Sequence, residues 1–291
     1  MFSGSLVALV TPMDKNGEID FSALTKLVDF HLSEGTDGLV IVGTTGEAAT
    51  LTAKEQEQLL RHAVEQVKGK IPVIAGTGVT STAKTIESTK AAMQLGVDAC
   101  LLMAPAYVKP TQEGLYQHFK AIAEAVPVPQ IIYNVPSRTA SDILPETVAR
   151  LAELPNIIGI KEASGDLERT RSIVAQCGDK IDVYSGDDNL TKDIILAGGK
   201  GVISVTANVA PRLMHDLCQA ALSKDIQGAD EINNRLIPLH EKLFVESNPI
   251  PVKWAVHKMG LMPAGVRLPL TPLSSEAQPI VESALRDTGI I

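Results

Sequence analysis

Short apolar runs alternate with longer amphipathic stretches along most of the chain. Eight such runs, most of them rich in Val, Ile and Leu, have the length and pattern of buried parallel strands. They cover residues 5–12, 37–44, 72–78, 99–105, 130–136, 157–163, 182–188 and 201–207. The first starts at Ser5 and the last at Gly201, so seven intervals span 196 residues and the mean repeat is 28. A strand followed by a returning helix has this length.

The stretches between these runs carry signals for helix ends. Gly35, Gly69 and Gly96 follow helical patterns and are expected to stop them. Thr52 is followed by Glu55, which is the spacing of a capping box. The residues expected at or near helix starts as N-caps are Asp20, Thr52, Ser81, Thr111 and Asp166.

Eight βα repeats fit either a closed barrel or an open doubly wound sheet, and the number eight favours an α/β fold of the (β/α)8 TIM-barrel type. A dinucleotide-binding sheet would need a GxGxxG segment directly after its first strand, and residues 5–12 are not followed by one. Near Lys224 the strand pattern stops while helical periodicity continues. We therefore expect a catalytic barrel over residues 1–223 and a C-terminal helical extension over residues 224–291.

Composition and charge narrow the class of protein. The 291 residues are 45% hydrophobic and 21% charged, which is typical of a folded globular chain. The 26 Lys and Arg against 34 Asp and Glu give a net charge of −8 without a basic cluster, so nucleic acid is not an expected partner. No apolar run approaches the roughly 18 residues of a membrane span and no signal peptide is evident, so we expect no membrane association and a cytoplasmic location.

Cysteine and histidine spacing argues against bound metals and disulfides. Cys100, Cys177 and Cys218 are far apart and odd in number. The six histidines show no spacing typical of metal ligands. We therefore expect no metal site and no disulfide framework.

Lys161 is the most informative of the polar residues that follow the apolar runs, where barrel active sites lie. It ends the run IIGIK, and strand alternation predicts that it shares a face with Ile157 and Gly159, with open space beneath it at the glycine. A desolvated lysine amine is a nucleophile for a carbonyl carbon. The residues leave a second interpretation open, in which Lys161 forms a buried ion pair with Glu162 or Asp187.

Tyr133 lies 28 residues before Lys161, which is the mean repeat itself. The two side chains are therefore expected at the same height on neighbouring strands, where a phenol beside an amine can shuttle protons. Thr44, in the turn after the second run, offers a hydroxyl for a relay. Arg138 presents a fork suited to a carboxylate, or alternatively a surface salt bridge.

Two long segments carry a resemblance to a known family. GTTGEAATLT from Gly43 resembles the first signature of the class I, Schiff-base-forming lyase and synthase family. YNVPSRTASDILPETVARLAELPNIIGIKEASGD from Tyr133 resembles its second. The similarity also includes VALVTP near the N-terminus, GVISVTANVAPR and NPIPVKW, so it covers essentially the whole chain.

The resemblance implies a reaction and roles for particular residues. Lys161 would form an imine with pyruvate, and the derived enamine would attack the aldehyde of L-aspartate 4-semialdehyde. The product would be 4-hydroxy-tetrahydrodipicolinate, made in the committed step of the diaminopimelate route to lysine. Tyr133, Thr44 and Tyr107 would form a proton relay, with Tyr107 supplied by a neighbouring subunit.

The resemblance also implies binding groups and an assembly. Thr45 and the backbones of Gly186 and Ile203 would hold pyruvate, and Arg138 would hold the carboxylate of the semialdehyde. The family needs no organic cofactor or catalytic metal, and it forms homo-oligomers, typically a tetramer of two tight dimers. The sequence leaves a dimer open as the alternative.

Arg138 favours the synthase over sibling lyases that cleave sialic or other sugar acids, because those usually lack an arginine here. A catalytically silent barrel that binds pyruvate-like acids is a further alternative, against which the complete set of site residues argues. At the positions that line a lysine feedback site in some relatives, this chain has a small or uncharged residue or a cation. We therefore expect weak or absent lysine inhibition. These residues are Ala53, Gln56, Thr80, Lys84 and Ala106.

Overall fold

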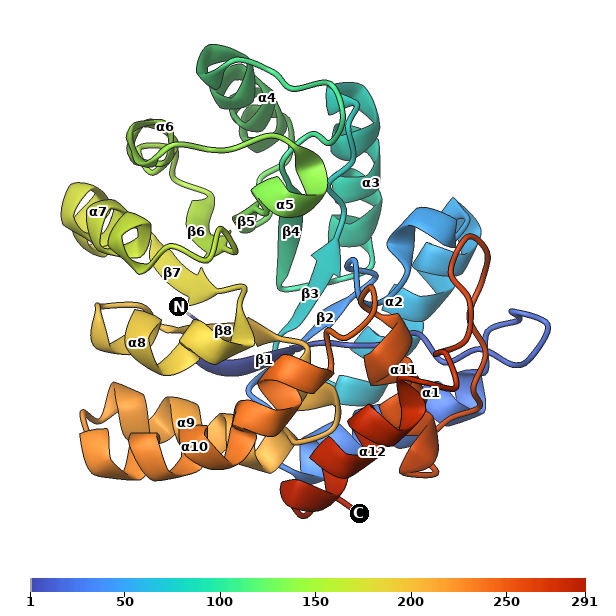
Figure 1. The fold of residues 1–291 in the computed structure, drawn as a ribbon. Helices are drawn as coiled ribbons and strands as arrows, with labels where there is room; N and C mark the ends of the chain where they lie inside the picture. The colour runs from blue at the N-terminus through green and yellow to red at the C-terminus, as the bar shows by residue number, and fades with distance from the viewer. Residues whose placement is uncertain (1) are drawn as a thin grey trace.

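A computed structural model describes residues 2–291. Eight parallel strands form a closed barrel in which each strand pairs with the next and β8 pairs with β1 (Figure 1). The strands are β1 (Gly4–Ala8), β2 (Gly38–Ile41), β3 (Val73–Gly76), β4 (Ala99–Met103), β5 (Gln130–Asn134), β6 (Ile157–Glu162), β7 (Asp182–Ser185) and β8 (Gly201–Ser204). Each begins within one residue of its predicted run. The (β/α)8 prediction is confirmed, and the open sheet is excluded.

Helices follow the strands and surround the barrel (Figure 1). They are α1 (Phe21–Ser33), α2 (Ala53–Val67), α3 (Thr82–Gln94), α4 (Gln112–Ala125), α5 (Pro136–Thr139), α6 (Pro145–Leu151), α7 (Leu167–Cys177), α8 (Thr191–Leu196) and α9 (Pro211–Leu222). Four short 3-10 helices add to them: η1 (Ala48–Thr50), η2 (Gly178–Lys180), η3 (Asp188–Leu190) and η4 (Thr206–Asn208).

The predicted helix boundaries are confirmed. The side chains of all five predicted N-caps accept a backbone N–H from the first turn of α1, α2, α3, α4 or α7. Thr52 and Glu55 form the expected capping box. Gly35, Gly69 and Gly96 follow α1, α2 and α3 with φ of 79°, 73° and 84°, a region that favours glycine.

Two hydrophobic layers hold the barrel together. The outer layer lies between strands and helices, and the inner layer fills the barrel with side chains from alternate strand positions. The inner layer includes Leu6, Ala8, Val40, Ile74, Ala99, Leu101, Ile131, Tyr133, Ile158, Tyr184 and Ile203. The apolar interior ends in polar side chains at the carboxyl ends of the strands, where the site is built.

The start of β6 departs from simple alternation. The register with β5 shifts between Gln130 and Ile131, so Ile157 belongs to the outer layer and Ile158 to the inner one. The prediction that Ile157 shares a face with Lys161 is therefore wrong. The expected open space at Gly159 is also absent, because the ring of Tyr184 fills it: a Cβ at Gly159 would lie 3.0 Å from Tyr184 Cε2.

Three further helices follow the barrel: α10 (Ile226–Lys242), α11 (Ile250–Lys258) and α12 (Gln278–Asp287). α10 packs on α9, and α12 packs on both α10 and α11, so the orange-to-red end of the chain gathers on one side of the barrel (Figure 1). We propose the division into a barrel over residues 1–223 and an extension over residues 224–291, because α9, the helix that follows β8, ends at Leu222. None of the helices within residues 2–291 has the length and hydrophobicity of a membrane span.

Candidate active site

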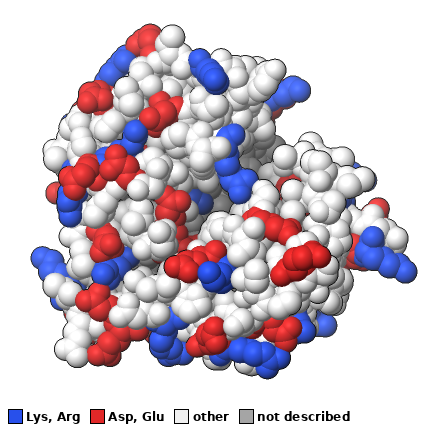
Figure 2. All heavy atoms as spheres, viewed as in Figure 1, with Lys and Arg blue, Asp and Glu red and all other residues white. Residues whose placement is uncertain are grey.

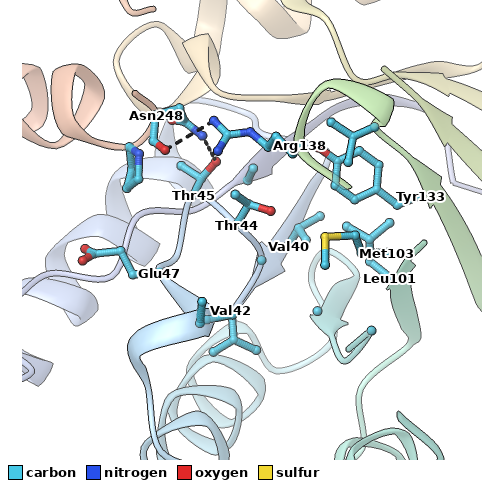
Figure 3. Close-up of a pocket in the computed structure, with 18 of the residues that line it drawn as sticks. Val40, Val42, Thr44, Thr45, Glu47, Leu101, Met103, Tyr133, Arg138 and Asn248 are labelled. Carbon is cyan, nitrogen blue, oxygen red and sulfur yellow. Dashed lines mark hydrogen bonds between the residues drawn. The ribbon is translucent and has the colours of Figure 1, made fainter. Parts of the chain in front are cut away.

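A cavity of about 670 Å³ opens at the carboxyl ends of the strands. It corresponds to the hollow near the centre of the face in Figure 2, with basic and acidic side chains around its rim. Six of the predicted site residues line it: Thr44, Thr45, Tyr133, Arg138, Lys161 and Gly186. Much of the remaining wall is apolar and includes Val40, Val42, Leu101 and Met103 (Figure 3). The loops after β2, β5, β6 and β7 thus converge on one space.

Lys161 is buried in this cavity, with 6% of its surface exposed. Burial lowers the pKa of its amine to about 8, although the nearby Asp188 and Asp187 carboxylates favour the charged form. Among residues 2–291 it has no ion-pair partner within 4 Å. A substantial share of the amine is therefore neutral near physiological pH, as a nucleophile requires.

The alternative in which Lys161 forms a buried ion pair is wrong. The Glu162 carboxylate accepts hydrogen bonds from Asn134 Nδ2, at 3.2 Å and 3.3 Å, and from the Ser164 backbone N–H at 2.8 Å. Asp187 accepts the Gly165 backbone N–H at 3.0 Å. Strand alternation turns Glu162 away from the face that carries Lys161, which explains why sequence neighbours do not pair.

Tyr133 stands directly opposite Lys161 in the register of β5 and β6, as predicted. The Lys161 Nζ atom lies 4.5 Å from the centroid of the Tyr133 ring. Tyr133 is 8% exposed, and burial raises the pKa of its phenol well above the usual value. The phenol therefore keeps its proton near neutral pH and is available as an acid beside the amine.

Gly186 provides the space that the lysine side chain occupies. A Cβ at this position would lie 2.5 Å from Ala163 Cβ and 3.0 Å from Lys161 Cε. The Gly186 N–H donates to the Glu162 carbonyl at 2.7 Å, so this donor is engaged within the barrel. The close packing fixes the path of the Lys161 stem into the cavity.

The β2 loop and the C-terminal extension meet at Thr45. The Asn248 side-chain amide donates to Thr45 Oγ1 at 3.0 Å, and Arg138 Nη2 donates to the Asn248 carbonyl at 3.4 Å (Figure 3). Thr44, half-buried, lies between Thr45 and Tyr133 in the same view. Sequence reasoning missed Asn248 as a cavity residue, although it begins the NPIPVKW segment on which part of the resemblance rests.

A buried charge pair also escaped the sequence reasoning. Lys253 of α11 forms an ion pair with Glu47, and their side chains are 1% and 0% exposed. The Arg267 backbone N–H donates to the second oxygen of the same carboxylate at 3.3 Å. No local signal identifies this pair, because the two residues are 206 positions apart in the sequence.

Two predicted site residues are not among those that line the cavity. Tyr107 is 91% exposed, with φ of 74° and its N–H donating to the Thr139 carbonyl. Ile203 is fully buried in the inner layer of the barrel. Within the described part of the chain, neither is among the residues that line the cavity.

The assembled residues are suited to carbonyl chemistry. They combine a desolvated amine, a protonated phenol, two threonine hydroxyls and a guanidinium that faces the cavity. Within residues 2–291, no group of three or more His, Cys, Asp and Glu side chains is arranged to hold a metal ion.

Comparison with known proteins identifies the family of this chain. The model of the dihydrodipicolinate synthetase family matches residues 1–288. The chain belongs to this family. It is 60% identical over 291 residues to the 4-hydroxy-tetrahydrodipicolinate synthase of Pseudomonas aeruginosa, with 100% of both chains covered. It is 58% identical over 290 residues to that of Thioalkalivibrio sulfidiphilus, covering 100% of this chain and 99% of the relative.

Solved structures of the family have the same fold. The chloride-inhibited dihydrodipicolinate synthase from Acinetobacter baumannii, complexed with pyruvate, superimposes with a TM-score of 0.99 at 52% identity, with 100% of each chain covered. The enzyme from Cyanidioschyzon merolae with lysine bound gives a TM-score of 0.97 at 38% identity, covering 100% of this chain and 99% of the other. The resemblance identified in the sequence is confirmed over the full length.

Proposed function

We propose that this lyase condenses pyruvate with L-aspartate 4-semialdehyde through a Schiff base on Lys161, giving 4-hydroxy-tetrahydrodipicolinate. The observation that carries the proposal is the pairing of Lys161 with Tyr133 at the mouth of the barrel. The name shared by the full-length relatives supports the same reaction. The pyruvate bound in the Acinetobacter structure supports pyruvate as the first substrate.

The amine of Lys161 attacks the carbonyl carbon of pyruvate, and water leaves as the iminium forms. Loss of a proton from the pyruvate methyl group gives an enamine, whose carbon attacks the aldehyde of the second substrate. The amino group of that substrate then adds to the iminium carbon and displaces the Lys161 amine, which closes the product ring and frees the enzyme. Tyr133 supplies and accepts protons in these steps, and Thr44 extends the relay. Burial of the amine favours the first step, because its lone pair is free at a lower pH than in water.

Binding groups surround this centre. Thr45 and the backbones of Gly186 and Ile203 hold the pyruvate end, and Arg138 holds the carboxylate of the semialdehyde. The position of Arg138 on the cavity wall supports this assignment. A sugar-acid lyase would present a polyhydroxylated substrate to the same wall, where a guanidinium is a poorer match.

Tyr107 completes the relay from a neighbouring subunit, so the active enzyme is a homo-oligomer, either a dimer or a tetramer of two dimers. The high exposure of Tyr107, and of Val108 beside it, supports an interface at this segment. We also propose a cytoplasmic location. Support comes from Cys100, Cys177 and Cys218, which are buried and free.

Borohydride trapping tests this function directly. Protein incubated with pyruvate and borohydride should carry one reduced adduct on the peptide that contains Lys161. A coupled assay should show consumption of pyruvate only when L-aspartate 4-semialdehyde is present. An adduct at another lysine, or a Lys161→Ala variant with wild-type activity, would overturn the mechanism. Release of pyruvate from N-acetylneuraminate without turnover of the semialdehyde would instead identify a sibling lyase.

A further inference from the structure

The buried pair of Lys253 and Glu47 has no part in the chemistry proposed above. Lys253 comes from α11 in the C-terminal extension, and Glu47 closes the loop after β2. Figure 3 shows the Glu47 carboxylate directed away from Thr44 and Tyr133, so it does not present charge to the reacting groups. Any effect of the pair on the reaction is therefore transmitted through the backbone that carries Glu47.

That chain is the loop of residues 42–47, which includes Thr44 and Thr45. The loop begins at Val42 and ends at Glu47, whose φ angles are 53° and 58°. This is a left-handed backbone conformation that residues other than glycine rarely adopt. The Glu47 N–H donates to the Thr44 carbonyl at 3.0 Å. Because both ends are strained, the loop needs contacts from outside itself to keep this shape.

Those contacts come largely from the C-terminal extension. Lys253 and the Arg267 backbone N–H bind the two oxygens of the Glu47 carboxylate. The Arg267 guanidinium donates to the Thr50 carbonyl at 3.1 Å and pairs with Glu55. Asn248 donates to Thr45, so the extension contacts the loop at Thr45 and at Glu47, on both sides of Gly46.

The charges themselves indicate a role beyond stability. Two ions out of water carry a large desolvation cost, and an apolar pair of the same volume is often equally or more stable. A carboxylate with two directed donors, by contrast, fixes the backbone that carries it in one position. We propose that Lys253 and Glu47 are positioning residues for pyruvate, whose ion pair holds the loop so that Thr44 and Thr45 face Lys161. This inference rests on the proposed function.

Three variants and one control test it. Lys253→Met and Glu47→Gln each leave one buried charge unpaired, so both are expected to lower Tm. The double variant carries neither charge and is expected to regain most of the Tm. Lys258→Met removes an exposed ion pair with Glu282 from the same helix and serves as the matched control. Steady-state assays give the KM of each substrate for every variant that folds.

In the double variant we expect the KM for pyruvate to rise at least tenfold, while the KM for L-aspartate 4-semialdehyde stays within threefold of wild type. Lys258→Met should leave both values unchanged. A double variant with recovered Tm and a pyruvate KM within twofold of wild type would overturn the inference. Borohydride trapping of the wild type separates the two proposals: no adduct on Lys161 defeats the proposed function, whereas an adduct with an unchanged KM in the double variant defeats this inference alone.

Discussion

Lys161 and Tyr133 face each other across adjacent strands, with the lysine Nζ atom 4.5 Å from the centroid of the tyrosine ring. The aromatic face can attract the ammonium form, yet burial outweighs this and lowers the pKa of the amine to about 8. The arrangement therefore provides an amine that binds and releases a proton close to working pH.

The rate of adduct formation should follow the titration of Lys161. With a pKa of about 8, about a tenth of the amine is neutral at pH 7, whereas an ordinary lysine would be less than about a thousandth neutral. Initial rates of trapping with pyruvate should therefore rise up to about tenfold per pH unit below pH 8 and level off above it. A rate that still climbs tenfold between about pH 9 and pH 10 would show that the pKa is not lowered.

Replacing Lys161 should stabilise the fold at neutral pH. Its pKa is lower in the folded than in the unfolded state, so between about pH 8 and pH 10.5 the unfolded chain binds more protons and stability rises with pH. Below this window the wild type carries a penalty of about 3 kcal/mol. Lys161→Met should raise Tm at pH 7, and the gain should shrink above pH 10. An equal gain at both pH values would contradict the linkage.

Tyr133→Phe should separate the phenol from the ring. The variant keeps the buried ring but loses the proton donor, so we expect kcat to fall about 10²- to 10⁴-fold with little change in Tm. Tyr184→Phe is the matched control. Tyr184 is paired with Lys161 in the register of β6 and β7, but its hydroxyl donates to the Phe2 carbonyl at 2.8 Å. It should lose about 1 kcal/mol of stability and keep kcat within threefold. Equal losses of kcat in both variants would argue against a proton relay.

Gly186→Ala should displace the lysine stem. Its added Cβ would lie 2.5 Å from Ala163 Cβ and 3.0 Å from Lys161 Cε. We expect a loss of about 1–3 kcal/mol in unfolding free energy and slower adduct formation. Adding Ala163→Gly removes the shorter clash and should recover part of both. Recovery of stability without recovery of trapping would assign the activity loss to the contact with Lys161 Cε.

Inhibition by L-lysine should be weak or absent. The Gln56 amide donates to the Ala48 carbonyl at 3.0 Å and is therefore engaged. Lys84 is an exposed cation. Thr80, four residues before it, donates its hydroxyl to the Ala106 carbonyl. Half-inhibition should require more than about 1 mM lysine, an affinity near 4 kcal/mol. Lys84→Glu should lower that concentration. Inhibition of the wild type well below 1 mM would contradict the prediction.

Local patterns accounted for most of the architecture. Strand starts follow from apolar runs and helix starts from single cap residues such as Asp20 and Thr52, because these depend on neighbours in the sequence. The same repeat placed Tyr133 opposite Lys161. These predictions succeeded because each repeat of the barrel is built in the same way.

Features that depend on distant partners were not predictable in this way. The register shift between β5 and β6 at Ile131 places Ile157 in the outer layer. The apolar pattern of the two strands carries no signal for this shift. The space at Gly159 is filled by Tyr184, which comes from the neighbouring strand β7 and not from the run that contains Gly159. Likewise, the pairing of Glu47 with Lys253 depends on how the extension packs, which single-residue patterns do not encode.

The barrel closes through its first and last strands, with Gly4 paired to Gly201 and both flanks of β1 occupied only when β8 is in place. On the ribosome, β1 therefore keeps one unpaired edge until most of the protein has been synthesised. The loop that carries Thr44 can reach its final conformation only later, because Lys253 and Arg267, which bind Glu47, are synthesised after the barrel. A product of premature termination before Arg267 thus lacks a finished site, so activity reports on a chain translated at least as far as Arg267.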